Sequence, residues 1–367
     1  MSVDWRREAD VSTPPVVDEN RIYTAGGTAF RRDGRVDWTR DGSGSLALGE
    51  EYLYAGGDPI RVLDPEDGAA LGEIVTGGSV INRSGPVVAD GTVYHYADRF
   101  PEERDARRIV LAATSPDDDT DWEFTLAEIP DRTREPQFRF GPPVVNEDAV
   151  YVIGQREEAQ DDGPSVTTVT LHAVSRSDGT ERWSREIDGE QPGQSSVVDG
   201  ALYVSIRQET GDELTRELKA LDAGDGAEKW AFGEEVDGLS PVAVADGRAF
   251  VATVTVPDEP ESADEPAPDP ERSVRALSAD DGSQAWERGI DMRVSGDANA
   301  PVVAGDTVYL AGGDGTFGRR GRILALATGD GSRRWRAETD DAFVTHPVVV
   351  GGRIYAGTRN GLLYALS

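Results

Sequence analysis

Short apolar runs alternate with tight turns along the whole chain, and no segment sustains the 3.6-residue periodicity of an amphipathic helix. Two phrases recur. The first is Pro-Val-Val, a short turn rich in Asp, Glu or Gly, and then Val or Ile before a Tyr, as in residues 86–94. The second is an apolar strand, a turn containing Asp-Gly, three further residues and a Trp, as in residues 220–230. This pattern predicts a protein of short β-strands that repeat one motif.

The first phrase occurs eight times. It is complete at residues 15–23, 86–94, 143–151, 301–309 and 347–355, and degenerate at residues 46–54, 195–203 and 241–250. Each repeat supplies four strands, named A to D in chain order, with Pro-Val-Val in strand A and Val-Tyr in strand B. Radial repetition is how such motifs bury both faces of their sheets. We therefore predict an all-β fold, an eight-bladed β-propeller of four-stranded antiparallel blades that forms a single domain over residues 1–367.

Tryptophans mark strand D of nearly every repeat. They are Trp5, Trp38, Trp122, Trp183, Trp230, Trp286 and Trp335, and the second repeat has Leu71 or Gly72 in the corresponding place. A tryptophan ring buries about 150–250 Å² and is suited to joining neighbouring blades. Because the second repeat lacks this ring, we expect the second blade to pack least tightly. Residues 3–5 and 347–367 are complementary half-repeats, which predicts a ring closed by the N- and C-terminal strands. An open solenoid is the alternative.

Charge excludes several kinds of partner. Asp and Glu number 69 against 37 Lys and Arg, a formal net charge of −32, which is incompatible with binding nucleic acid through its phosphates or inserting into anionic membranes. Such a composition is typical of halophilic proteins, because molar salt shortens the Debye length to about 3 Å and screens the repulsion. The chain has no cysteine, which excludes disulfides and thiolate metal sites. The three histidines, in different blades, lack ligand spacing, so no metal site is predicted.

No apolar run is long enough to span a membrane, and the N-terminal residues lack the apolar core of a signal peptide. The sequence therefore does not decide whether the protein is extracytoplasmic or cytoplasmic. Nor does it decide whether the sequon at Asn82 is glycosylated. Residues 257–271, with five prolines and seven acids, predict a disordered loop. We expect a monomer.

Ala220, Asp222, Gly226 and Trp230 resemble the repeat of the pyrroloquinoline quinone (PQQ) family, Ala-x-Asp-x-x-Thr-Gly-x-x-x-Trp, with Asp225 in place of Thr. The resemblance implies a propeller whose tryptophans dock between blades. The family includes quinoprotein dehydrogenases and BamB-type lipoproteins that act as scaffolds in outer-membrane assembly, so the resemblance leaves activity open. Extracytoplasmic location is slightly favoured by it.

Two functions fit these observations. The first is a non-catalytic scaffold, without catalytic residues or cofactor, that binds a protein through the face carrying the B–C and D–A loops. Insertions collect between strands B and C, at residues 96–107, 155–168, 207–217, 253–272 and 312–321. The alternative is an alcohol or sugar dehydrogenase that uses PQQ and Ca²⁺. Family dehydrogenases typically carry a vicinal disulfide, which a chain without cysteine lacks. The sequence therefore favours a protein that is not an enzyme but does not decide the question.

Aligning strand A on the aromatic residue of strand B places small or polar residues at the mouth of the predicted channel. The candidate ligand-binding residues there are Thr13, Ser84, Ser240, Asn299 and Thr345, flanked by Arg83, Arg139 and His346. These side chains could hold an anionic or hydroxylated ligand. The alternative is a water-filled channel lined by ordinary turn residues.

Overall fold

Regular structure in this computed structural model consists of β-strands. It describes residues 1–42, 44–77, 85–100, 106–116, 119–130, 136–160, 165–190, 193–210, 213–233, 236–257, 269–293, 300–314 and 319–367. Among these residues no helix is long and apolar enough to cross a membrane. By packing, the chain divides into two units, one of residues 1–19, 201–222 and 227–367 and the other of residues 20–200 and 223–226.

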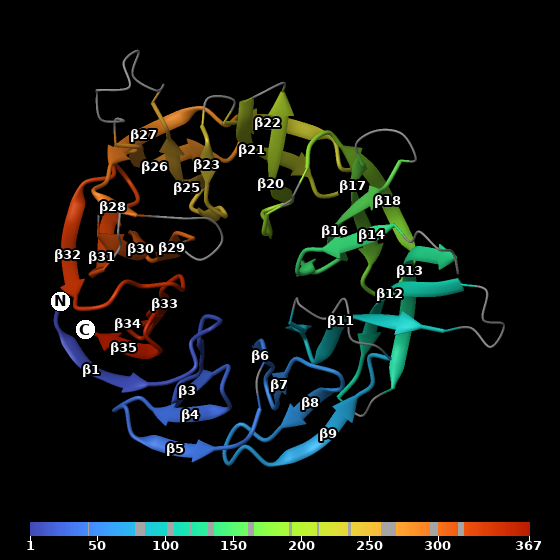
Figure 1. Cartoon of the computed structure of the whole chain (residues 1–367), viewed down its shortest axis with the longest axis horizontal. Helices are drawn as coiled ribbons and strands as arrows, with labels where there is room; N and C mark the ends of the chain where they lie inside the picture. The colour runs from blue at the N-terminus through green and yellow to red at the C-terminus, as the bar shows by residue number, and fades with distance from the viewer. Residues whose placement is uncertain are drawn as a thin grey trace. The chain divides into compact units, whose positions relative to one another are not determined.

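The strands form eight antiparallel sheets, which confirms the predicted all-β class and the eight four-stranded blades of a β-propeller (Figure 1). Blade 1 is β2 (Val16–Val17), β3 (Arg21–Thr24), β4 (Thr28–Arg31) and β5 (Val36–Thr39). Blade 2 is β6 (Leu46–Leu48), β7 (Leu53–Ala55), β8 (Ile60–Leu63) and β9 (Ala70–Ile74). Blade 3 is β10 (Val87–Ala89), β11 (Thr92–Arg99), β12 (Ala106–Thr114) and β13 (Thr120–Pro130). Blade 4 is β14 (Gln137–Phe140) with β15 (Val144–Val145), β16 (Ala149–Glu158), β17 (Val166–Ser175) and β18 (Glu181–Ile187).

The other four blades follow the same order. Blade 5 is β19 (Ser195–Val198), β20 (Ala201–Thr210), β21 (Glu213–Asp222) and β22 (Glu228–Phe232). Blade 6 is β23 (Gly238–Leu239) with β24 (Ala243–Ala245), β25 (Arg248–Thr255), β26 (Glu271–Ser278) and β27 (Gln284–Gly289). Blade 7 is β28 (Met292–Arg293) with β29 (Val302–Ala304), β30 (Thr307–Asp314), β31 (Gly321–Ala327) and β32 (Arg333–Thr339). Blade 8 is β33 (Val348–Val350), β34 (Arg353–Gly357), β35 (Leu362–Leu366) and β1 (Val3–Glu8).

Blade 8 combines both ends of the chain. Its outer strand β1 pairs antiparallel with β35, and the Ser367 hydroxyl donates a hydrogen bond of 2.6 Å to Asp4 Oδ1, 363 residues away. Figure 1 shows the two chain ends side by side at this blade. The expected pairing of N- and C-terminal strands is confirmed.

The two sequence phrases meet inside each blade. In blade 5, Tyr203 of strand B lies opposite Ala220 of strand C, which lies opposite Trp230 of strand D. The small Ala leaves room for the two rings to approach across it, and their centroids are 5.9 Å apart. The same contact, at 5.9–6.1 Å, recurs in Tyr23–Trp38, Tyr94–Trp122, Tyr151–Trp183, Phe250–Trp286, Tyr309–Trp335 and Trp5–Tyr355.

Blade 2 departs from this arrangement in two positions at once. Gly72 takes the place of the Trp, and Val62 takes the place of the central Ala, opposite Tyr54. The larger Val occupies part of the space that the missing ring would fill. Sequence comparison alone left the choice between Leu71 and Gly72 open, and the strand register assigns Gly72.

The tryptophans also contact the next blade along the chain. Trp230 donates from Nε1 to the carbonyl of Ala279 at 2.9 Å, and its ring covers Gly282 of the C–D turn. Gly282 has φ +72, and a Cβ there would lie 2.8 Å from the ring, so only glycine suits the position. The same pairs are Trp38–Gly68, Trp122–Gly179, Trp183–Gly226 and Trp286–Gly331. Blade 3, which follows Gly72, has no glycine in its turn.

The Asp before each turn glycine caps the turn. Asp281 Oδ1 accepts hydrogen bonds from the Ser283 hydroxyl at 2.7 Å and the Ser283 backbone N–H at 3.0 Å. These bonds, with the hydroxyl contributing most, lower the pKa of Asp281. Asp178 and Asp330 accept the backbone N–H two residues on in the same way. The Asp-Gly form of the repeat, which departs from the family's Thr-Gly, thus closes the turn with a carboxylate.

Among the described residues of the predicted B–C insertions, most continue strands B and C. In blade 5, β20 and β21 each run for 10 residues, whereas β3 and β4 of blade 1 have 4 each. Pairing satisfies the backbone of the extra residues, which a loop would leave to solvent. Of the predicted disordered loop 257–271, residues 258–268 lie outside the described residues. Glu271 was wrongly included, because it begins β26 and pairs with Thr255.

Candidate binding site

Three of the channel-mouth candidates, Arg83, Ser84 and Asn299, lie outside the described residues. Thr13, Ser240, Thr345 and His346 belong to one packing unit, and Arg139, exposed on β14, belongs to the other. Within its unit, Thr13 has a buried Oγ1 without a hydrogen-bond partner among the described residues. The channel-mouth site therefore stays a prediction.

Ser240 and Thr345 use their hydroxyls inside their own blades. Ser240 Oγ accepts the Ala252 N–H at 2.9 Å and donates to the Pro241 carbonyl, and Thr345 Oγ1 accepts the Gly357 N–H at 2.8 Å. Both bonds span 12 residues and join the segment before β24 or β33 to strand B of the same blade, β25 or β34. The side chains are 4% and 2% exposed, so these hydroxyls replace a ladder bond and are not presented to a ligand.

Burial lowers the pKa of His346 below its ordinary value of 6.5, so the folded protein keeps this imidazole neutral in mild acid. The unfolded chain takes up a proton as the pH falls through about 6.5, and the folded chain does so only at lower pH. We expect the unfolding free energy of the wild type to fall in that window relative to His346→Asn. Denaturant melts of both proteins at several pH values measure this difference, and parallel pH profiles would contradict it.

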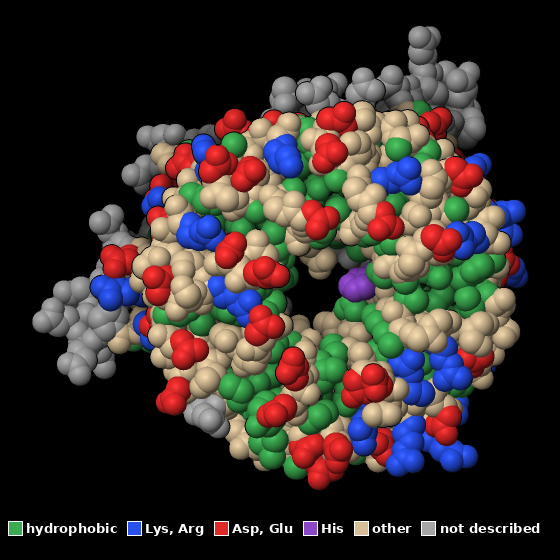
Figure 2. All heavy atoms as spheres, turned by 180° about the vertical axis from the view of Figure 1, so that it is seen from behind, with side chains coloured by type: hydrophobic (Ala, Val, Ile, Leu, Met, Phe, Trp, Pro, Cys, Tyr) green, Lys and Arg blue, Asp and Glu red, His purple; other side chains and the backbone are tan. Residues whose placement is uncertain are grey.

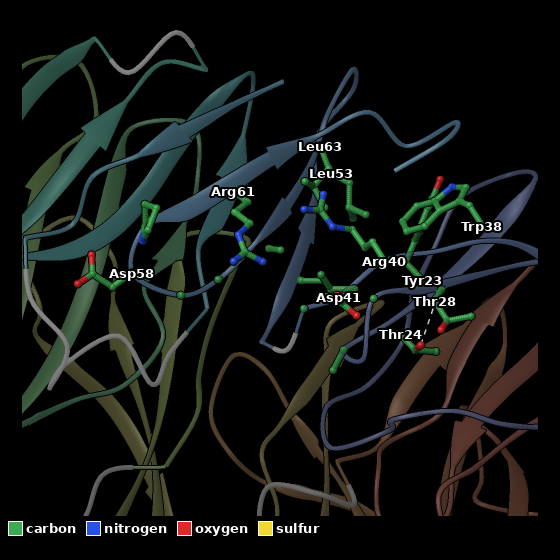
Figure 3. A pocket seen from close by; sticks show the side chains of 18 residues that line it. Tyr23, Thr24, Thr28, Trp38, Arg40, Asp41, Leu53, Asp58, Arg61 and Leu63 are labelled. Atoms are coloured by element: carbon green, nitrogen blue, oxygen red, sulfur yellow. Dashed lines mark hydrogen bonds between the residues drawn. The ribbon is translucent and has the colours of Figure 1, made fainter. Parts of the chain in front are cut away.

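A cavity of about 440 Å³ lies between blades 1 and 2 (Figure 3). Its apolar wall is formed by Tyr23, Trp38, Leu53 and Leu63, which come from strands B and D of blade 1 and strands B and C of blade 2. Residues 24–28 and 55–59, the B–C turns of the two blades, form its rim. Sequence analysis missed this site because it followed the B–C insertions, and blades 1 and 2 have none: β3, β4, β7 and β8 are strands of only three or four residues.

Four charged side chains line the cavity: Arg40, Asp41, Asp58 and Arg61. Two of them are engaged, since Arg40 NH1 donates to the Gly68 carbonyl at 2.9 Å and Asp58 Oδ1 accepts the Thr76 hydroxyl at 2.8 Å. Arg61 and Asp41 are exposed. Neither forms an ion pair within the part of the chain that the structure describes.

Hydrogen bonds to blade 2 hold two residues of the apolar wall in place. The carbonyl of Pro65 accepts two hydrogen bonds, from Trp38 Nε1 at 3.2 Å and from the Tyr23 hydroxyl at 3.1 Å. Both rings are thereby fixed to blade 2 by the same contact that joins the blades elsewhere. An apolar, preformed wall with a few polar groups at the rim is the usual form of a small-molecule site.

The residues present do not fit the PQQ and Ca²⁺ of the dehydrogenase alternative. Ca²⁺ requires six to eight oxygen ligands, largely carboxylates. Across the described ranges, no three His, Asp or Glu side chains are grouped closely enough to hold a metal ion. The cavity between blades 1 and 2 offers Asp41 and Asp58, of which Asp58 is bonded to Thr76. What these described residues offer a small molecule is an apolar wall and four charged side chains.

Comparison with known proteins identifies structures that share this fold. No curated protein matches the chain. BamB from Moraxella catarrhalis is 18% identical with a TM-score of 0.61, and the match covers 99% of this chain and 96% of that chain. Quinohemoprotein alcohol dehydrogenase from Comamonas testosteroni is 14% identical with a TM-score of 0.61, over 99% of this chain and 76% of that chain. The computationally designed Ika8 protein is 12% identical with a TM-score of 0.59, over 98% of this chain and 96% of that chain.

At such identities the solved structures establish the fold alone, and it is shared by proteins named for assembly and for oxidation. Sequence gives the more specific result. A family model described as outer membrane protein assembly factor BamB matches residues 28–195, 106–259 and 270–367. These matches include most of the chain, so the PQQ-like repeat inferred from Ala220, Gly226 and Trp230 is confirmed. The chain belongs to the family described as outer membrane protein assembly factor BamB.

Proposed function

We propose that this protein is a non-catalytic scaffold that binds a protein partner on the extracytoplasmic side of the cell. Family membership supports the proposal, because the family is described as an assembly factor. The scaffold acts as a monomer and without a cofactor. Its binding residues lie at the outer ends of the B–C hairpins of blades 3–7.

The observation that carries this proposal is the position of exposed apolar side chains. Phe100, at the end of β11, is 66% exposed, Val166, at the start of β17, is 51% exposed, and Val256, after β25, is 54% exposed. Each lies at the outer end of a B–C hairpin, and together they are three of the eight exposed large hydrophobic side chains of the described residues. Apolar residues at loop ends are suited to a protein interface.

Site-specific crosslinking tests the proposal. A photoreactive amino acid placed at Phe100, Val166 or Val256, in living cells that encode the protein, should give a discrete adduct with one protein of the outer-membrane assembly machinery. Val36 is the control, since it is 56% exposed but follows a C–D turn, at the opposite end of its blade. Equal adducts from Val36, or none from the hairpins, would contradict the proposal.

Polar substitution gives the matching binding result. Phe100→Ser should weaken partner binding by at least about tenfold, since truncation of an interface anchor commonly costs about 2 kcal/mol, whereas Val36→Ser should leave it unchanged. Alcohol- or sugar-dependent dye reduction that requires PQQ and Ca²⁺ would instead support the dehydrogenase function.

A further inference from the structure

The cavity between blades 1 and 2 combines an apolar wall with two opposite charges that are not engaged with each other. Arg61 projects from β8, and Asp41 follows β5 of the neighbouring blade (Figure 3). They form no ion pair, because their charged atoms are not within 4.0 Å in the described structure. Both side chains line the same cavity, and neither charge is neutralised by the other.

The apolar wall requires a ligand with an apolar part. Trp38, Leu53 and Leu63 line the same cavity as Arg61 and Asp41, and its volume of about 440 Å³ lies within the usual range for small-molecule sites. A charged head group with an apolar tail meets both requirements, with the head at the rim and the tail against Trp38.

The overall charge of the protein favours a ligand with no net charge. A net charge of −32 repels anions at long range, and Arg61 acts on them only locally. A cation would meet Asp41 but also the guanidinium groups of Arg40 and Arg61. A zwitterion avoids both penalties, because its carboxylate lies on Arg61 while its ammonium lies at Asp41.

We propose that the cavity between blades 1 and 2 binds a small zwitterion with an apolar side chain, of the chemical class of the hydrophobic α-amino acids. The carboxylate is bound by Arg61, the ammonium by Asp41, and the side chain packs on Trp38, Leu53 and Leu63. The residues of this site do not include the hairpin ends at Phe100, Val166 and Val256. The ligand-binding test is therefore independent of the test of the partner-binding surface.

Calorimetric titration with three related probes tests the proposal. L-phenylalanine carries both charges, 3-phenylpropionate lacks the ammonium, and 2-phenylethylamine lacks the carboxylate. L-phenylalanine should bind at least about tenfold more tightly than either of the others. Failure of L-phenylalanine to bind at about 10 mM, or equal binding of all three, would overturn it.

Two variants assign the charges. Arg61→Gln should weaken the binding of L-phenylalanine and 3-phenylpropionate without weakening that of 2-phenylethylamine, and Asp41→Asn should weaken the binding of L-phenylalanine and 2-phenylethylamine only. Arg61→Lys should restore part of the lost affinity. Arg35→Gln is the matched control, because Arg35 has a side chain that is 80% exposed and does not line the cavity.

Both rim side chains are exposed, so the variants should keep the circular dichroism spectrum of the wild type. If L-phenylalanine binding survives Arg61→Gln and Asp41→Asn unchanged, the assignment is wrong. Glucose binding that depends on the same two residues, without L-phenylalanine binding, would overturn the zwitterion in favour of a hydroxylated ligand.

Discussion

Replacing Gly282 by Ala should lower the unfolding free energy by about 2–5 kcal/mol, and the same change at Gly247 should cost only about 1–2 kcal/mol. Both glycines belong to blade 6, with φ of +72 and +68, so an added Cβ strains the backbone equally. They differ in surroundings. A Cβ at Gly282 would lie 2.8 Å from the Trp230 ring, whereas at Gly247 nothing lies within 4 Å. Denaturant melts of the two variants compare the costs directly.

A double-mutant cycle isolates the ring contact. Trp230→Ala alone should cost about 3–5 kcal/mol, as expected for removal of a core aromatic residue. In that background Gly282→Ala should cost no more than Gly247→Ala, because the ring that its Cβ would strike is gone. Additive costs at 230 and 282 would mean that the Trp-Gly contact does not determine how blades 5 and 6 pack.

Lowering the salt concentration should destabilise the fold strongly, up to loss of the β circular dichroism spectrum in about 10 mM salt. The cause is the net charge of −32, which self-repels when the Debye length grows from about 3 Å at 1 M to about 30 Å at 0.01 M. Figure 2 shows Asp and Glu side chains spread over the displayed face, with Lys and Arg among them.

Circular dichroism and melting temperature during dialysis from about 1 M to about 10 mM salt measure this effect. Sodium chloride and ammonium sulfate at equal ionic strength separate screening from preferential exclusion, and sucrose is the uncharged control. A melting temperature that does not change with salt would contradict the prediction.

The blades could be predicted because their signals are local. Tyr203, Ala220 and Trp230 recur at fixed spacing, and strand pairing alone brings these residues together. The site could not be predicted in the same way. Alignment selected Ser240 and Thr345 but could not show that their hydroxyls form hydrogen bonds within the blade. The cavity is lined by Trp38 and Arg61, which belong to different blades. No local sequence pattern specifies how close such residues lie in the fold.

The pairing of β1 with β35 also bears on how the protein is made. During synthesis β1 emerges long before residues 362–366, its partners in blade 8. For most of translation it is therefore an unpaired edge strand, available to wrong partners. Blades 1–7, by contrast, take their strands from consecutive segments and can form as the chain emerges. Blade 8 can consequently be completed only after residues 362–366 have been synthesised.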